Sequence, residues 1–131
     1  MTTYKKMLSE ARKSKHYGQF KFPAENTQAG QCLLFYYKHM NKIISKQNIE
    51  SHVCDKLGIS TRDVQAVRHL GKQSGFDIIQ GGRGVIFNGK SVKKGYYVFR
   101  GFEKLNAYFS LSRREEKDLD FKKLKEKFNY Q

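Results

Sequence analysis

The residues from 60 to 72 carry side chains that can make paired hydrogen bonds from one side of a helix. Arginine can form two hydrogen bonds with the O6 and N7 atoms of guanine, and glutamine can form two with the N6 and N7 atoms of adenine. Arg62 and Gln65 supply these groups on the face opposite Val64 and Val67. Hydroxyl and basic side chains nearby suit phosphate oxygens instead. The candidate contacts are Ser60, Thr61, Arg62, Gln65, Arg68, His69 and Lys72.

A second group of basic side chains lies in a glycine-rich stretch, residues 81–95. A backbone with little side-chain bulk can approach a groove or a chain of phosphates closely. We therefore expect this stretch to form a wing that contacts nucleic acid beside the helix. Its candidate contacts are Arg83, Lys90, Lys93 and Lys94.

The overall charge also favours an anionic partner. The 131 residues include 26 Lys and Arg against 12 Asp and Glu, which gives a net charge of +14. Apolar residues make up 38% and aromatic residues 14%, too much for a disordered polybasic tail and enough for one modest core. Nucleic acid is the favoured partner and an anionic membrane surface the second. No apolar run reaches the roughly 18 residues of a membrane span, so we expect none.

Three helices are expected to position the first group of side chains. Apolar residues at helical spacing predict a helix over about 25–45. Asn48 is expected to cap a second helix, 49–57, which Gly58 ends in a left-handed conformation. The third helix spans 60–73, and its first four residues resemble a capping box with Asp in place of Glu.

The second and third helices follow the helix-turn-helix spacing. That pattern needs a glycine at the turn, a small residue where the helices touch, and apolar residues at fixed offsets. Gly58 stands at the turn and Cys54 at the close contact. The apolar offsets fall on Val53, Leu57, Ile59, Val64 and Val67. Two ordinary amphipathic helices joined by a glycine turn are the alternative interpretation.

After Gly75 the apolar spacing changes from helical to that of strands. Residues 76–80 and 96–100 are predicted to be strands. Asn88-Gly89 predicts a tight hairpin turn between them. The expected fold is therefore α+β, a winged helix-turn-helix with a three-helix core and a β-hairpin wing.

We expect this domain to cover residues 24–101, with an appendage on each side. Residues 1–23 are predicted to be a basic arm, with a short helix over 3–15 and then an extended link. The arm either adds phosphate contacts or is disordered in the free protein. Its basic residues are Lys5, Lys6, Arg12, Lys13 and Lys15.

Residues 102–131 are predicted to be a helical extension, with helices near 103–111 and 117–128. Apolar side chains share one face of the last helix. This face either folds back on the core or forms a homodimer interface, and both alternatives stay open. Its residues are Phe121, Leu124 and Phe128.

No pattern of residues predicts catalysis. The run from Gly84 to Ser91 matches the phosphate-loop pattern G-x-x-x-x-G-K-[ST], but its interior favours a strand and another strand follows, whereas phosphate binding needs a helix there. Cys32 and Cys54 lack zinc-ligand spacing and are expected to be small buried residues. No paired-carboxylate or nucleophile–base motif is visible. We expect no enzyme, no metal and no cofactor.

Residues 48–100 resemble the winged helix-turn-helix domain of bacterial and phage regulators, most closely the biotin-repressor type. The segments GISTRDVQAVRHLGKQSGFDII and KKGYYV carry the resemblance. In that family a glycine and an apolar strand follow the recognition helix, and a basic wing leads to a second strand. Gly75 to Ile79 and Lys94 to Tyr97 stand in those places. The wing is longer here, and the resemblance implies no ligase activity.

The resemblance implies sequence-specific binding of double-stranded DNA by the 60–73 helix and the 81–95 wing. The expected role is that of a cytoplasmic, nucleoid-associated transcription regulator of a bacterium, phage or mobile element. Two other classes stay open. One is a winged-helix module that docks on a protein such as a host enzyme. The other is an RNA or single-strand binder, which needs Tyr36, Tyr96 and Tyr97 exposed for stacking.

Overall fold

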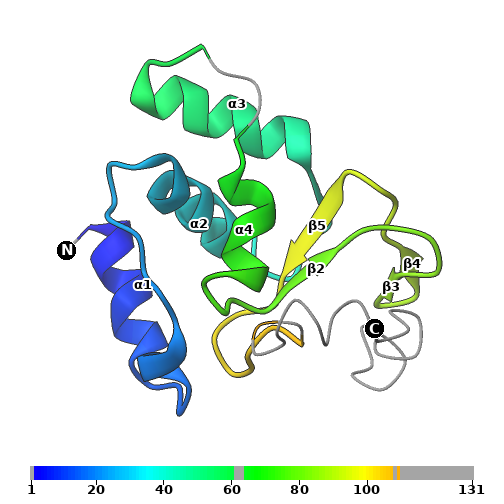
Figure 1. Ribbon diagram of the computed structural model, residues 1–131, viewed down its shortest axis with the longest axis horizontal. Coiled ribbons are helices and arrows are strands. Elements are labelled where there is room, and N and C mark those ends of the chain that lie inside the picture. Colours follow the sequence, from blue (N-terminus) through cyan, green and yellow to red (C-terminus); the bar gives the residue numbers. More distant parts are fainter. Residues whose placement is uncertain (1, 61–63, 108, 110–131) are drawn as a thin grey trace.

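The computed structural model describes residues 2–60, 64–107 and 109, and over these residues the fold is α+β (Figure 1). None of the described helices has the length and apolar content that a membrane span needs. The helices are α1 (Thr3–Ala11), α2 (Gln28–Lys38), α3 (Lys46–Leu57) and α4 (Ala66–Lys72), with a 3-10 turn at Tyr17–Gln19. The strands are β1 (Ile44–Ser45), β2 (Ile78–Gln80), β3 (Ile86–Phe87), β4 (Lys90–Ser91) and β5 (Tyr96–Phe99).

Side-chain hydroxyls set the starts of the first three helices. The Thr2, Thr27 and Ser45 oxygens each accept a hydrogen bond from a backbone N–H in the first turn of the helix that follows. The predicted cap of α3, Asn48, is wrong, because Ser45 lies three residues earlier and accepts from the Asn48 N–H at 3.2 Å. Gly58 ends α3 with a φ of +64°, as predicted.

The main sheet has the strand order β1-β5-β2, with both pairs antiparallel. The two predicted strands are confirmed as β2 and β5. Strand β1 was not expected, and it shortens the predicted 25–45 helix, because Ile44 pairs with Tyr97 rather than continuing α2. Asn88 and Gly89 have φ of 50° and 76°, which confirms the hairpin turn between β3 and β4.

Two apolar cores lie on the two faces of this sheet. Along β5, Tyr97 and Phe99 belong to the larger core with the helices, whereas Val98 belongs to a smaller core. This alternation follows from the period of two in a strand. The smaller core consists of Ile79, Val85, Phe87, Val92 and Val98. The glycine-rich hairpin therefore packs on the sheet face opposite the helices.

The N-terminal segment is part of the main core. Met7 and Ala11 are fully buried, and α1 lies beside α2 (Figure 1). The Tyr4 hydroxyl donates a hydrogen bond to the Pro23 carbonyl. The short helix predicted in the basic arm is present but ends at Ala11 rather than at residue 15, and its apolar stripe is buried in the main core.

The chain after β5 turns back against the core. The Phe102 ring contacts the rings of Phe76 and Phe99. The Asn106 N–H donates to the Gly75 carbonyl at 3.0 Å. The predicted 103–111 helix is absent from residues 103–107 and 109. The predicted 117–128 helix, with its proposed dimer face, lies outside the described residues.

Candidate nucleic-acid interface

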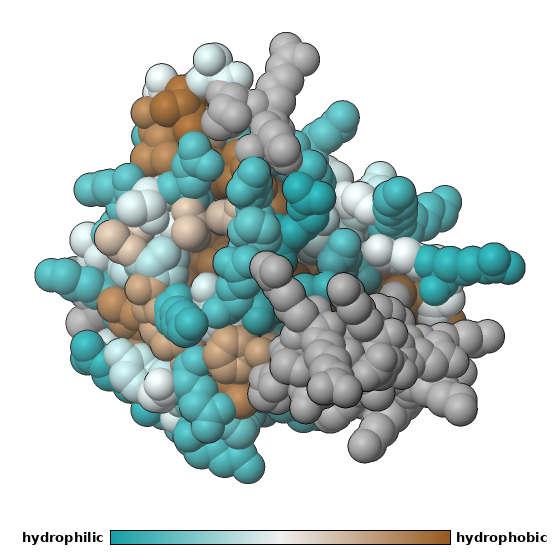
Figure 2. All heavy atoms as spheres, viewed as in Figure 1, coloured by the Kyte–Doolittle hydropathy of each residue, from teal (hydrophilic) through white to brown (hydrophobic). Residues whose placement is uncertain are grey.

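Helix α4 has one buried side and one exposed side. Val67 and Leu70 are 1% and 2% exposed, respectively. Arg68, His69 and Lys72 lie on the exposed side. With Gln65, which is exposed just before the helix, they form a stripe at offsets 0, 3, 4 and 7 from residue 65. We call these four residues the α4 stripe. Figure 2 shows hydrophilic surface over α4 on the face turned to the viewer.

Two hydrogen bonds hold α4 in place from neighbouring helices. The hydroxyl of Tyr36, a fully buried residue on α2, donates to the Val67 carbonyl at 3.0 Å. Glu50 of α3 accepts from the Val64 N–H at 2.9 Å. An interface built on a rigid element keeps its contact geometry, so these bonds matter for recognition as well as for stability.

The start of the predicted recognition helix is only partly described. Thr61 and Arg62, with the rest of the expected capping box, lie outside the described residues. Ser60 is exposed and precedes α4, which begins at Ala66 rather than at residue 60. The structure therefore brings together four of the seven predicted contacts on this helix.

Side chains are buried at three of the five apolar positions of the helix-turn-helix pattern. Val53, Val64 and Val67 are at most 1% exposed, as expected, and Leu57 is half-buried. Ile59 is 36% exposed, which contradicts its expected place in the core. It lies beyond the left-handed residue that ends α3, where the chain leaves the packed helix. Cys32 is buried as predicted, and Cys54 is only half-buried.

The four predicted wing contacts, Arg83, Lys90, Lys93 and Lys94, are all exposed. Val85 and Val92 lie beneath them in the smaller core, and the Val92 N–H donates to the Val85 carbonyl at 2.8 Å. The Gly82 N–H donates to the Val92 carbonyl at 2.9 Å. These basic side chains therefore extend from a packed hairpin. The run that resembles a phosphate loop is this β3–β4 hairpin, and the next element of the described chain is a strand, β5.

The turn that carries Lys93 and Lys94 is bonded on two sides. The Gly81 N–H donates to the Tyr96 carbonyl, and the Lys46 N–H donates to the Gly95 carbonyl, each at 2.8 Å. The second bond joins the hairpin to the first residue of α3. The sequence does not predict this link, because a strand as short as β1 leaves no periodic signal before Lys46.

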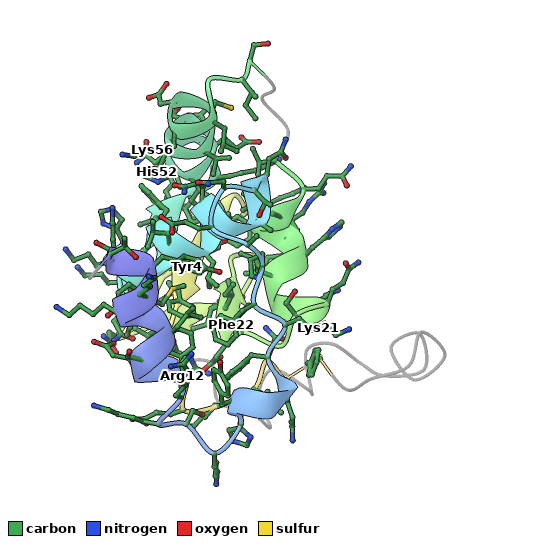
Figure 3. The ribbon with its side chains drawn as sticks, turned by 90° about the vertical axis from the view of Figure 1, so that its left-hand side faces the viewer. Tyr4, Arg12, Lys21, Phe22, His52 and Lys56 are labelled. Carbon is green, nitrogen blue, oxygen red and sulfur yellow. The ribbon has the colours of Figure 1, made fainter. Side chains whose placement is uncertain are left out.

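Two ionisable groups lie apart from these contacts. The Asp77 carboxylate accepts two hydrogen bonds from Arg100, both at 3.1 Å. Burial raises the pKa of Asp77, and Arg100 opposes that rise. His52 packs its ring 4.9 Å from that of Phe35, and burial and nearby lysines lower its pKa. Figure 3 shows His52 and Lys56 on the side of α3 away from α4.

In the described part of the chain, no three His, Cys, Asp or Glu side chains gather where they could hold a metal ion. Comparison with protein-family models, with curated proteins and with solved structures finds no match to this chain. The function of this chain is therefore inferred from the geometry of the α4 stripe and the hairpin.

Proposed function

We propose that this protein binds double-stranded DNA and recognises its sequence with α4. The observation that carries the proposal is the α4 stripe, an exposed row of polar and basic side chains on a helix whose other side is buried. Such a helix can enter the major groove, where each base pair presents a distinct pattern of donors and acceptors.

The arrangement of the elements supports a winged helix-turn-helix. In chain order, α2, β1, α3 and α4 are followed by β2 and β5, with the β3–β4 hairpin between these last two strands. Because β2 and β5 are antiparallel neighbours, the hairpin lies where β2 ends and β5 begins (Figure 1). In this interpretation α4 is the recognition helix and the hairpin is the wing.

Each group has a defined role in the proposed complex. Gln65, at the start of α4, reads a base, because the N-terminal part of a recognition helix is the part nearest the base edges. Arg62 is proposed as a second base contact from its place in the sequence pattern. Arg68, Lys72 and the basic hairpin residues neutralise phosphates, which gives affinity without sequence information. Each paired base contact contributes about 1–3 kcal/mol of discrimination.

The single-strand alternative is less well supported. A stacking platform needs exposed aromatic faces. Tyr36 is fully buried and Tyr97 is 4% exposed, so of the three candidate tyrosines only Tyr96, at 41%, is available. We propose a transcription regulator that acts by occupying DNA, with docking on a protein as the outcome to be tested against it.

The test is selection of random double-stranded oligonucleotides by the full chain at about 50 and 200 mM salt. We expect an enriched motif that Gln65→Ala relaxes at one position. Lys72→Ala is expected to weaken binding to all sequences alike. Lys56→Ala, which removes one charge from the far side of α3, is the matched control and is expected to bind as the parent does. Absence of duplex binding at the lower salt concentration would overturn the proposal and leave the protein-docking class.

A further inference from the structure

The linker before α2 brings one lysine to the end of α4. The Lys21 N–H donates a hydrogen bond to the carbonyl of Ser74, two residues after α4 ends, at 3.0 Å. The Lys21 side chain is exposed. In Figure 3 Lys21 lies beside the lower end of α4, whereas Arg12 lies at the end of α1.

Two aromatic neighbours fix the backbone at this lysine. The ring of Phe20 stacks on that of Phe76, with centroids 5.2 Å apart and planes 6° apart. The ring of Phe22 meets the same Phe76 edge-on at 5.1 Å. The chain leaves the 3-10 turn in an extended conformation at Phe20, so successive side chains point to opposite sides. Lys21 therefore points to solvent while its neighbours point to the core.

We propose that Lys21 is a phosphate contact of the DNA interface, on the strand that borders the groove entered by α4. This inference rests on the proposed function and extends the interface to the N-terminal linker. From Gln65 to Lys72 the helix rises about 10 Å, so when Gln65 at its N-terminal end contacts a base, Lys72 lies toward the wall of the groove. A cation beyond Lys72, beside Ser74, then faces the sugar-phosphate chain and not the bases.

The geometry separates Lys21 from the basic residues of α1. The buried side of α1 faces the core through Tyr4, Met7 and Ala11. Its cations therefore extend from the outer side of a helix that packs on α2. The linker lysine instead shares a hydrogen-bonded junction with the end of the recognition helix. We therefore assign the N-terminal contribution to Lys21.

The test measures duplex affinity against salt concentration for Lys21→Gln, Lys72→Gln and Lys56→Gln. Each lost phosphate contact lowers the slope of log K against log salt by about 0.9. We expect that loss for Lys21→Gln on every duplex sequence, with the selected motif unchanged. Lys21→Arg, which keeps the charge, is expected to restore the slope. Lys56→Gln is expected to match the parent protein.

The outcomes distinguish this inference from the function it rests on. If Lys72→Gln lowers the slope and Lys21→Gln does not, the linker contact is wrong and DNA binding by α4 stands. If the parent chain binds no duplex, both proposals fail. Unchanged thermal unfolding of Lys21→Gln ensures that a lower slope reports a lost contact, since the bond to Ser74 is made by the backbone.

Discussion

The carboxylate of Glu50 on α3 accepts a hydrogen bond from the backbone N–H of Val64, at 2.9 Å, just before α4 begins. Val64 is fully buried, so water cannot readily replace this acceptor. Gln65, the N-terminal flanking residue of α4, makes no side-chain cap bond. The Glu50 carboxylate therefore links α3 to the segment that begins α4, the proposed recognition helix.

Replacement of this carboxylate is expected to lower stability and DNA affinity together. Glu50→Ala leaves the buried Val64 N–H without a partner, which costs about 1–3 kcal/mol. Urea unfolding measures the loss as a lower midpoint at unchanged slope. Glu50→Gln keeps an acceptor oxygen and is expected to lose less. Equal midpoints for Glu50→Ala and the parent would show that the bond contributes nothing to folding.

The hydrogen bond from the Tyr36 hydroxyl to α4 is expected to stabilise the folded protein. Tyr36→Phe removes the donor to the Val67 carbonyl at a fully buried site and is expected to cost about 1 kcal/mol. Tyr96→Phe is the matched control, because that side chain is 41% exposed, and its effect is expected to be within about 0.5 kcal/mol. Thermal unfolding of the two variants compares them directly. A larger loss for Tyr96→Phe would contradict the assignment.

A side chain at position 81 is expected to lower the stability of the folded protein. A Cβ there would lie 1.9 Å from the Lys93 carbonyl oxygen, so the turn that carries Lys93 and Lys94 would have to shift. We expect Gly81→Ala to cost about 1–3 kcal/mol, as overpacking does. Gly18→Ala meets nothing within 4 Å and is expected to be neutral or slightly stabilising. Denaturant unfolding compares Gly81→Ala with Gly18→Ala. Equal midpoints for the two variants would refute the close approach of position 81 to the Lys93 carbonyl.

The basic turn of the hairpin is expected to supply affinity without specificity. Lys93 and Lys94 are exposed and their turn is bonded to Gly81 and to α3. The double change of both lysines to Gln is expected to lower the salt slope by up to about 1.8 and leave the selected motif unchanged. Gln65→Ala is expected to do the reverse. A changed motif in the double variant would show that the hairpin reads bases.

Acid is expected to destabilise the α2–α3 contact through His52. Its Nε2 atom is buried without a hydrogen-bond partner. Its pKa is lowered by burial first, then by Lys38, Lys56 and His39, with Asp55 opposing. Because the unfolded chain binds the proton more readily, this group's contribution to stability falls as the pH drops through the unfolded value near 6.5.

The pH dependence is measured by unfolding at about pH 7 and pH 5. His52→Gln, which never takes the proton, is expected to lose less stability between these values than the parent. The raised pKa of Asp77 acts with the opposite sign, toward greater stability in acid, and is common to both proteins. Equal losses in the two proteins would show that His52 does not drive the acid sensitivity.

Features set by neighbouring residues could be predicted from the sequence. Gly58 ends α3 and Asn88-Gly89 turns the hairpin because their backbone conformations follow from residue type. The exposed stripe and buried side of α4 follow from helical periodicity. The N-cap of α3 was predicted three residues too late, because serine and asparagine both suit this position. In the structure the N-cap is Ser45.

Apolar spacing alone did not show which surfaces pack. The stripe of α1 was visible, but its burial against α2 depends on a matching apolar face far along the chain. Ile59 fits the helix-turn-helix offsets and is still 36% exposed, just beyond the end of α3. Periodicity predicts that a face will be buried, and only the arrangement of its neighbours decides how completely.

The sequence by itself determined the α+β composition, the ends of several elements and the concentration of positive charge in the hairpin, because these depend on local conformation and residue type. Only the tertiary structure decided that Glu50 meets Val64, that Gly81 meets Lys93 and that Lys21 meets Ser74. Each pair joins residues that are distant in sequence. Such contacts depend on how the helices and the sheet pack together, and no local pattern encodes them.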